Sequence, residues 1–333
     1  MVKIVSRLHK NWLAVVIAAV VTFAGASAAL AQGTWKSLTP VPTPTEGMTV
    51  GGVGNLIIVA YGDSPALGGD TNLTRIYNIS KNSWSSGADA PLPARAEEAY
   101  GYTTTDGLMY VIGGRSEAGV INNLERYEVA TNSWTTLTPM PTPRAAAAAA
   151  VIGSAIFVAG GRDVGGGPCS GNPLDVVERY DIATDTWTTV APLPMPISDA
   201  AAVATGGKLY IIGGCNGDTF TFFNTVLVYN PTTNTWSSLA TMPTARASLV
   251  SGIVGSNLYA IGGWDGVAPL GLTTNEVYNI ASNTWSTAAP MPTSRGEAGV
   301  VSHNGNVFVV AGSRPGFGNS TDANEEFTPA PIK

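Results

Sequence analysis

Short apolar runs of about five residues recur along the chain, and each run stops at a pair of small residues, as in MYVIGG, IFVAGG, LYIIGG and LYAIGG. Runs of this length that end at turn residues predict buried β-strands. After residue 40 no segment keeps a 3.6-residue apolar period for three turns, so we expect almost no helix. The pairs are Gly113–Gly114, Gly160–Gly161, Gly213–Gly214 and Gly262–Gly263, with Tyr61–Gly62 and Gly312–Ser313 as weaker copies.

A tryptophan recurs with these runs at intervals of 49 to 53 residues. A segment such as ERYDIATDTW leads into most of the tryptophans, and a proline-rich segment such as PMPTSR follows. A fixed period of about fifty residues indicates a repeat architecture. The six tryptophans are Trp35, Trp84, Trp134, Trp187, Trp236 and Trp285.

The order of diglycine, tyrosine and tryptophan resembles the kelch repeat, and the resemblance covers the chain from residue 32 onward. A kelch repeat implies one blade of a β-propeller, with four antiparallel strands arranged outward from the axis. We name these strands a to d. In the third repeat the pattern predicts them at residues 144–152, 155–161, 174–182 and 187–191.

The two ends of the chain complete each other. The last repeat offers strands a, b and c at residues 295–301, 306–312 and 324–328 but has no tryptophan strand, whereas Trp35 has no strands before it. We therefore expect residues 35–38 to supply strand d of the last blade, which removes an open sheet edge. The predicted fold is all-β, a single six-bladed kelch β-propeller over residues 32–333.

The first 31 residues have the pattern of a secretory signal peptide. Lys3, Arg7 and Lys10 precede an apolar run over residues 12–31, and Ala29 and Ala31 fit a cleavage site. The run of 20 residues could instead remain as an uncleaved membrane anchor. In both cases we expect the rest of the chain to be exported, to the periplasm or the extracellular space.

Removing residues 1–31 leaves 14 basic and 23 acidic residues, a net charge of −9. A surface of this charge disfavours nucleic acid as a partner. No basic amphipathic segment follows residue 31, so we expect no membrane contact after cleavage, and we expect a monomer.

Arginine and glutamate recur together in four of the six repeats. The arginines begin strand a, and the glutamates precede the tyrosine or phenylalanine of strand c by two residues. This co-occurrence predicts an ion pair that crosses strand b; a ring of arginines facing a ligand is the alternative. We expect the glycine pair to leave space for the arginine and also to allow tight packing near the axis. The arginines are Arg95, Arg144, Arg246 and Arg295, and the glutamates are Glu125, Glu178, Glu276 and Glu325.

Three carboxylates, Glu97, Asp199 and Glu297, lie two residues beyond the start of strand a. Because a strand has a side-chain period of two, they are expected on the same side as the arginines. There they could bind a polar molecule or transfer protons, with Glu97 or Glu297 and Arg95 or Arg295 as catalytic candidates. Ordinary salt bridges are the alternative.

The loops between strands b and c carry the remaining candidates. Cys169 and Cys215 lie in the loops of adjacent blades three and four, which predicts a disulfide; two buried thiols are the alternative. Aromatic residues in these loops could form a platform for a sugar, an anchor for a protein, or self-packed loops. These residues are Phe220, Phe222, Phe223, Trp264 and Phe317.

Common catalytic templates are not met after residue 31. His303, in a predicted turn, is the one histidine, so a serine–histidine–aspartate triad and a histidine-based metal site lack residues. Galactose oxidase shares the kelch propeller, but its copper site needs two histidines, so this chemistry is rejected. No cofactor is expected.

Two functions remain. The first is a non-catalytic binding module that takes a protein, peptide or glycan on the face of the b–c loops. The alternative is an exported carbohydrate enzyme resembling the sialic acid mutarotases, which are also exported six-bladed kelch proteins.

Overall fold

The computed structural model describes residues 33–97, 107–268, 271–314 and 319–330. Two compact units are distinguished, Met1–Ala31 and Gln32–Lys333. The predicted signal peptide and its anchor alternative lie in the first unit, outside the described residues, and stay predictions. All elements below belong to the second unit.

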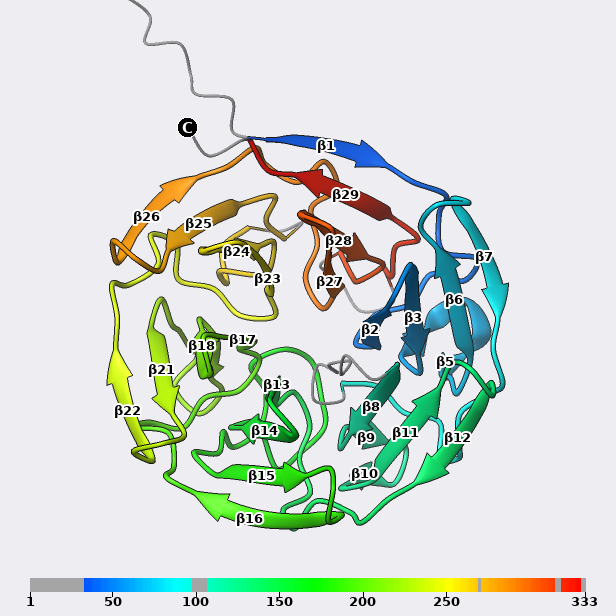
Figure 1. Ribbon diagram of the computed structural model, residues 1–333, viewed down its shortest axis with the longest axis horizontal. Helices are drawn as coiled ribbons and strands as arrows, with labels where there is room; N and C mark the ends of the chain where they lie inside the picture. The colour runs from blue at the N-terminus through cyan, green and yellow to red at the C-terminus, as the bar shows by residue number, and fades with distance from the viewer. Residues whose placement is uncertain (1–32, 98–106, 269–270, 315–318, 331–333) are drawn as a thin grey trace, which may run out of the picture. The chain divides into compact units, whose positions relative to one another are not determined.

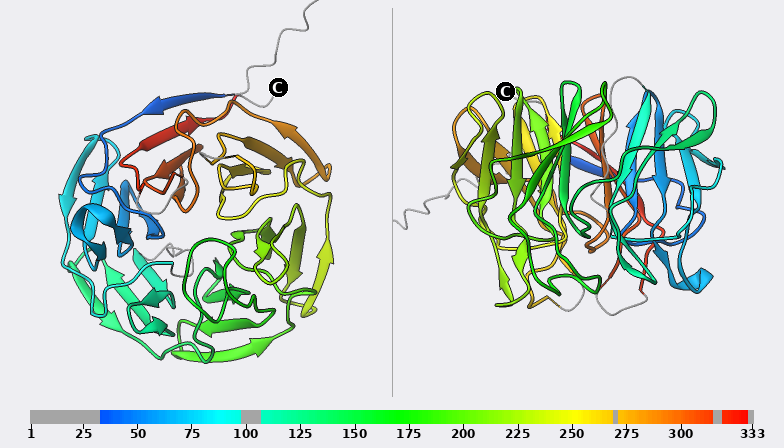
Figure 2. Two further views of the ribbon diagram at one scale, coloured as in Figure 1. Left: turned by 180° about the vertical axis from the view of Figure 1, so that it is seen from behind. Right: turned by 90° about the horizontal axis from the view of Figure 1, so that it is seen from below.

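Six sheets stand around a common axis, as the kelch resemblance predicted (Figure 1). In the side view of Figure 2 their strands run between the two ends of the propeller, where the loops lie. The four-stranded blades one, three, four and five are β2 (Thr49–Val53), β3 (Leu56–Ala60), β6 (Thr74–Asn78) and β7 (Ser83–Ser86); β13 (Ala148–Ile152), β14 (Ala155–Ala159), β15 (Val177–Asp181) and β16 (Thr186–Val190); β17 (Ala201–Thr205), β18 (Lys208–Ile212), β21 (Val226–Asn230) and β22 (Thr235–Ser238); β23 (Val250–Val254), β24 (Asn257–Ile261), β25 (Asn275–Asn279) and β26 (Thr284–Thr287).

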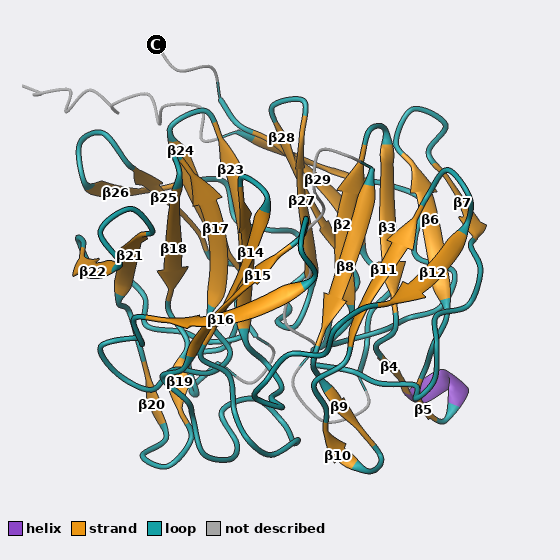
Figure 3. Ribbon diagram, turned by 60° about the horizontal axis from the view of Figure 1, so that its bottom comes forward, coloured by secondary structure: helices purple, strands orange, loops and turns teal. Residues whose placement is uncertain are grey.

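Blade two shows β8 (Leu108–Ile112), β11 (Leu124–Glu128) and β12 (Ser133–Thr136), and its innermost segment falls on residues 98–106, outside the described residues. Three b–c loops form small hairpins at one end of the propeller, which we call the b–c face (Figure 3). These hairpins are β4 (Asp63–Ser64) with β5 (Gly69–Asp70), β9 (Arg115–Ser116) with β10 (Gly119–Val120), and β19 (Cys215–Asn216) with β20 (Thr221–Phe222).

Helix is almost absent from the described residues, as expected: one 3-10 turn, η1 (Pro65–Leu67), follows β4. None of the helices in this part of the chain has the length and apolar character of a membrane span.

The sixth blade closes as predicted. Its strands are β27 (Gly299–His303), β28 (Asn306–Val310), β29 (Asn324–Thr328) and the N-terminal β1 (Thr34–Ser37). β1 pairs antiparallel with β29, which places Trp35 opposite Phe327 with ring centroids 5.0 Å apart. The pairing joins the two ends of the propeller and leaves no blade without its outer strand.

The repeated tyrosine and tryptophan join neighbouring blades at the outer rim. In blade three, Tyr180 lies opposite Trp187 and donates to Asp185, which also accepts the N–H of Thr138 from the preceding blade. The indole of Trp187 donates to the carbonyl oxygen of Thr138. Blades one, two, four and five repeat this arrangement with Asn82, Asn132, Asn234 and Asn283.

Near the axis, six residues with left-handed backbone join the blades in a second ring, which we call the axial ring. Each donates its backbone N–H to the carbonyl oxygen of the ring residue in the preceding blade, at 2.7–3.2 Å, and the sixth bond closes the circle. The φ angles lie between 48° and 58°. The members are Gly47, Glu97, Ala146, Asp199, Ser248 and Glu297.

The axial ring corrects one expectation. Strand a begins after the ring residue, at Ala148 rather than residue 144 in blade three. Because the ring residue is left-handed, the side-chain period of two does not hold between it and the arginine before it. The prediction that Glu97, Asp199 and Glu297 share a side with the arginines was therefore wrong.

The glycine pairs allow tight packing, as predicted, but the atoms nearest a Cβ on Gly160 or Gly161 belong to backbone and apolar side chains and not to an arginine. Both glycines of a pair are left-handed, and a Cβ on Gly160 would lie 2.2 Å from the carbonyl oxygen of Ile197 in the next blade. The N–H of Gly161 donates to that same oxygen at 2.9 Å. The pair thus permits backbone contact between blades. In blade six the left-handed pair is Ala311–Gly312, one residue earlier than expected.

The four predicted Arg–Glu ion pairs are confirmed, and their side chains are at most 4% exposed. Arg144 lies 2.6 Å from Glu178, and its guanidinium also donates to the carbonyl oxygen of Val158 on strand b. Breaking such a pair leaves a charge without a partner in the interior, which costs more than the pair itself contributes.

Glu276→Ala should lower the free energy of unfolding by about 3–5 kcal/mol, because it leaves the buried Arg246 guanidinium without its carboxylate. The control is Arg179→Ala, which breaks the partly exposed pair with Asp181 and should cost much less, because water screens that pair. Urea unfolding measures both values. Equal losses in the two variants would contradict the role assigned to the buried pair.

Candidate functional site

A cavity of about 250 Å³ lies within the axial part of the b–c face, and five of the six blades line it. We call it the axial pocket. Its chemistry is mostly charged, with one large aromatic side chain. The lining residues are Glu46, Asp63, Glu97, Arg115, Gly166, Gly167, Pro168, Trp264, Glu297, Ser313 and Arg314.

Two repeat positions supply most of this lining. One is the axial ring, whose left-handed residues include Glu97 and Glu297. The other is the residue directly after the left-handed pair, which bridges to the residue preceding the ring position of its own blade. That second position holds Asp63, Arg115, Arg162, Cys215, Trp264 and Ser313.

Sequence reasoning did not single out this second position. Its neighbours are nearly constant from repeat to repeat, whereas the position itself changes among acidic, basic, aromatic and small residues. That contrast is the signal that could have indicated this position, because a residue that varies between otherwise constant repeats can take part in ligand binding without changing the fold.

Arg162 organises the base of the pocket. It is fully buried and forms ion pairs with Glu97 and, at 2.8 Å, with Asp199, while it also donates to the carbonyl oxygen of Gly166. Burial lowers the pKa of Arg162, but Asp199 and Glu97 outweigh it, so the net pKa is raised. Arg162 therefore stays charged and holds two members of the axial ring.

Arg115 forms a second centre of charge. Its guanidinium lies 3.0 Å from Glu97, 3.2 Å from Asp70 and 3.4 Å from Asp63. Asp70 still has its pKa raised to about 6, first by burial, because Arg115 only partly offsets the loss of water. One guanidinium thus serves three carboxyl groups.

Two carboxyl groups of the axial pocket, Glu297 and Glu46, have no ion pair with any described residue. Glu297 is 6% exposed and accepts a hydrogen bond from the Ser313 hydroxyl at 3.1 Å. Burial raises its pKa well above the ordinary range, and Glu97 and Glu46 add to the effect. Burial, followed by Asp63, raises the pKa of Glu46 to about 7. Carboxyl groups of this kind hold protons near neutral pH.

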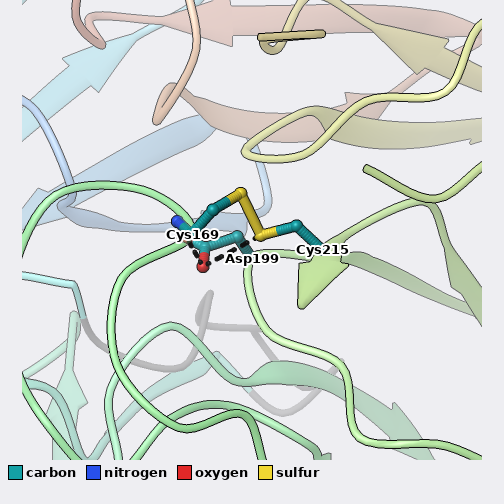
Figure 4. A group of neighbouring side chains, drawn as sticks. All are labelled: Cys169, Asp199 and Cys215. Carbon is teal, nitrogen blue, oxygen red and sulfur yellow. Dashed lines mark hydrogen bonds between the residues drawn. A yellow bond between two sulfur atoms is a disulfide. The ribbon is translucent and has the colours of Figure 1, made fainter. Parts of the chain in front are cut away.

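The predicted disulfide between Cys169 and Cys215 is confirmed (Figure 4). Asp199 lies beside it and accepts the backbone N–H of Cys169 at 3.3 Å. The bridge ties the loop that contains Gly166, Gly167 and Pro168 to blade four. It therefore fixes one wall of the axial pocket.

Among the described residues, these two cysteines and Asp199 are also the one group of three or more possible metal-binding side chains whose ligand atoms lie within 4.8 Å of each other. Both sulfur atoms are bonded in the disulfide, so this group does not offer free thiolates to a metal ion.

The predicted site residues separate into different environments. Glu97, Glu297 and Trp264 line the pocket, and Asp199 lies behind the lining, where it shares Arg162 with Glu97. Arg95, Arg144, Arg246 and Arg295 are buried in the blades, and a ligand-binding role for them stays a prediction.

The aromatic residues of the b–c loops do not form one platform. Phe220 is 79% exposed, Phe222 packs beside the disulfide, and Phe223 packs on the core between blades three and four. Trp264 alone among the four described residues reaches the axial pocket. Phe317 lies outside the described residues.

Comparison with known proteins agrees with the fold. The model of the KLHDC2/KLHL20/DRC7 kelch-repeats domain matches residues 47–263 and 166–325. The solved structure of YjhT covers 86% of this chain and 95% of its own, with a TM-score of 0.72 at 18% identity, which shows a shared fold.

Curated relatives match parts of the chain. Kelch-like protein terF of Aspergillus terreus is 29% identical over 192 residues, 53% of this chain and 40% of that protein. Kelch-like protein 25 of Xenopus tropicalis is 32% identical over 153 residues, 44% of this chain and 26% of that protein. The chain thus matches less than half the length of these relatives. With the repeat pattern, the six closed blades and the family match together, this chain belongs to the kelch-repeat family.

Proposed function

We propose that the axial pocket binds a small carbohydrate and interconverts its anomers, a chemistry resembling that of the sialic acid mutarotases. The observation that carries the proposal is the convergence of two proton-holding carboxyl groups, Glu46 and Glu297, in one cavity. The Ser313 hydroxyl donates a hydrogen bond to Glu297 and also lowers the pKa of Glu46, so one hydroxyl acts on both groups.

Anomer interconversion needs one proton donor and one proton acceptor. The acceptor removes the proton of the anomeric hydroxyl, the bond between the anomeric carbon and the ring oxygen breaks, and the donor protonates the ring oxygen. Closure on the other face of the resulting carbonyl gives the other anomer. Glu297 is assigned as the donor because burial raises its pKa well above the ordinary range, and Glu46 as the acceptor because its pKa is about 7.

The rest of the pocket supports this assignment. Trp264 offers an indole against which the apolar face of a sugar ring can pack. Arg115 and Arg162 hold Glu97 in place by ion pairs from two directions. The sequence-based hypothesis paired these glutamates with Arg95 or Arg295. Those two arginines are buried and do not line the pocket, so we assign that role to Arg115.

Non-catalytic binding is a second candidate, and exposed apolar side chains favour it. Phe220 and Val267 are 79% and 85% exposed in the b–c loops of the adjacent blades four and five. An exported monomer that uses these loops for a protein, peptide or glycan accounts for side chains that the fold itself does not need.

Anomer exchange tests the first candidate. Two-dimensional exchange NMR on reducing sugars should show faster interconversion with the chain from residue 32 onward, and Glu297→Gln should slow it by about 10²–10⁴-fold because the donor is removed. The rate should rise with pH as Glu46 loses its proton near pH 7, and it should fall at higher pH as Glu297 loses the proton that it donates. Glu128→Gln, in β11 outside the pocket, is the matched control. Sugar binding without exchange in the unaltered chain would favour the non-catalytic candidate.

The same glutamates should reduce stability. A carboxyl group whose folded pKa lies above its unfolded value destabilises the fold as pH rises through that interval. Glu297→Gln should therefore raise the free energy of unfolding at pH 8, and the gain should disappear near pH 4. Urea unfolding at both pH values measures this effect. A loss of stability at pH 8 would contradict the pKa assignment.

A further inference from the structure

The axial pocket has more carboxyl groups than guanidinium groups to neutralise them. Six carboxyl groups in the described residues lie in or directly behind its lining, with three arginines. Arg115 and Arg162 already make ion pairs with four of the six, and Arg314 is exposed at the rim, where water screens it. The carboxyl groups are Glu46, Asp63, Asp70, Glu97, Asp199 and Glu297.

The two carboxyl groups that remain each have an oxygen without a hydrogen-bond donor among the described residues. Glu297 is only 6% exposed and lines the cavity. Of its two carboxyl oxygens, Oε2 accepts a hydrogen bond from Ser313. The Oε2 atom of Glu46 is buried and accepts none. A buried acceptor without a donor is unfavourable, so the Glu46 Oε2 atom favours a ligand that brings N–H groups. Glu297, a buried carboxyl group with one hydrogen bond and no ion pair, can accept such a group as well.

A metal ion does not fit these two groups. The axial pocket is not among the places in the described residues where three ligand atoms lie within 4.8 Å of each other. Calcium and magnesium need several oxygens at about 2.0–2.6 Å from one point. An ammonium group carries three N–H donors and can reach separate carboxyl groups through hydrogen bonds.

Trp264 restricts the ligand further. Its indole lines the same cavity as Glu297 and Glu46. An indole packs against a sugar ring and also attracts a cation near its face. The cavity of about 250 Å³ leaves room for a small ring with its substituents rather than for a chain of sugars.

We propose that the axial pocket selects a monosaccharide that carries a free ammonium group, an amino sugar, over neutral and acidic sugars, with Glu297 and Glu46 as the groups that recognise the charge. The inference rests on the proposed function for the choice of a sugar. The choice of positive charge is independent of catalysis. This preference would differ from that of an enzyme for sialic acids, whose sugars carry a carboxylate.

Isothermal titration calorimetry at pH 7 with four probes tests the proposal: glucosamine, glucose, N-acetylglucosamine and glucuronic acid. Glucosamine should bind about 10–100-fold more tightly than glucose or N-acetylglucosamine, as expected for a hydrogen bond to a charged group, and glucuronic acid should bind most weakly. Because a cation lowers the pKa of a neighbouring carboxyl group, glucosamine binding should also release protons, seen as a binding heat that depends on the buffer.

Variants of the two glutamates distinguish a loss of ammonium recognition from a general loss of folding or sugar binding. Glu297→Gln and Glu46→Gln should each reduce the ratio of glucosamine to glucose affinity by at least about fivefold, and Glu128→Gln should leave it unchanged. Circular dichroism on each variant confirms that it is folded. An unchanged ratio in both glutamine variants would overturn the assignment of these residues.

Outcomes for the two proposals are distinct. Equal or weaker binding of glucosamine, with anomer exchange of neutral or acidic sugars, overturns the charge preference and leaves the proposed function standing. A glucosamine preference without exchange of any sugar overturns the proposed function and supports the charge preference. No binding of any of the four sugars overturns both.

Discussion

The axial ring of six backbone hydrogen bonds is the constraint on which the site depends. Each bond joins two blades, and each donor residue must adopt a left-handed backbone to make it. Five of the six residues are not glycine, although a non-glycine residue in this conformation is strained by about 1–3 kcal/mol. The surrounding blades hold that strain, and they thereby place Glu97, Asp199 and Glu297 around one axis.

The charge of the site follows from this geometry. Arginines that begin strand a lead into the blades and meet glutamates there, whereas the carboxyl groups two residues later lie at the axis. The guanidinium groups that pair with the carboxyl groups of the site come from Arg115 and Arg162, after the left-handed pairs of blades two and three. Blades four, five and six place a disulfide cysteine, an indole and a hydroxyl at that same position. Substitution at one repeat position thus makes a pseudo-symmetric scaffold asymmetric, and the deficit of positive charge is the result.

Much of the fold could be predicted from the sequence, because repeats compare a chain with itself. The closing pair of β1 and β29 followed from a missing strand at each end, and the Arg–Glu pairs followed from their joint presence in four repeats. The disulfide followed from the adjacency of two blades. The pocket was harder to predict from the sequence. A left-handed residue such as Glu297 interrupts the strand period, and no local sequence pattern marks that change in a non-glycine residue. Arg162 was missed since its contact with Glu97 joins residues in different blades, 65 apart in sequence.

The central claim is that the axial pocket holds two glutamate carboxyl groups, Glu46 and Glu297, where burial raises their pKa values well above the ordinary range. Carboxyl ¹³C chemical shifts of glutamate-labelled protein, followed from pH 4 to pH 9, measure this directly. Two resonances should titrate well above the ordinary range, that of Glu46 near pH 7, and substitution of Glu46 or Glu297 by glutamine should remove one of them and move the other. If every glutamate instead titrates below about pH 5, as exposed carboxyl groups do, the pocket does not hold protons and the proposed chemistry is wrong.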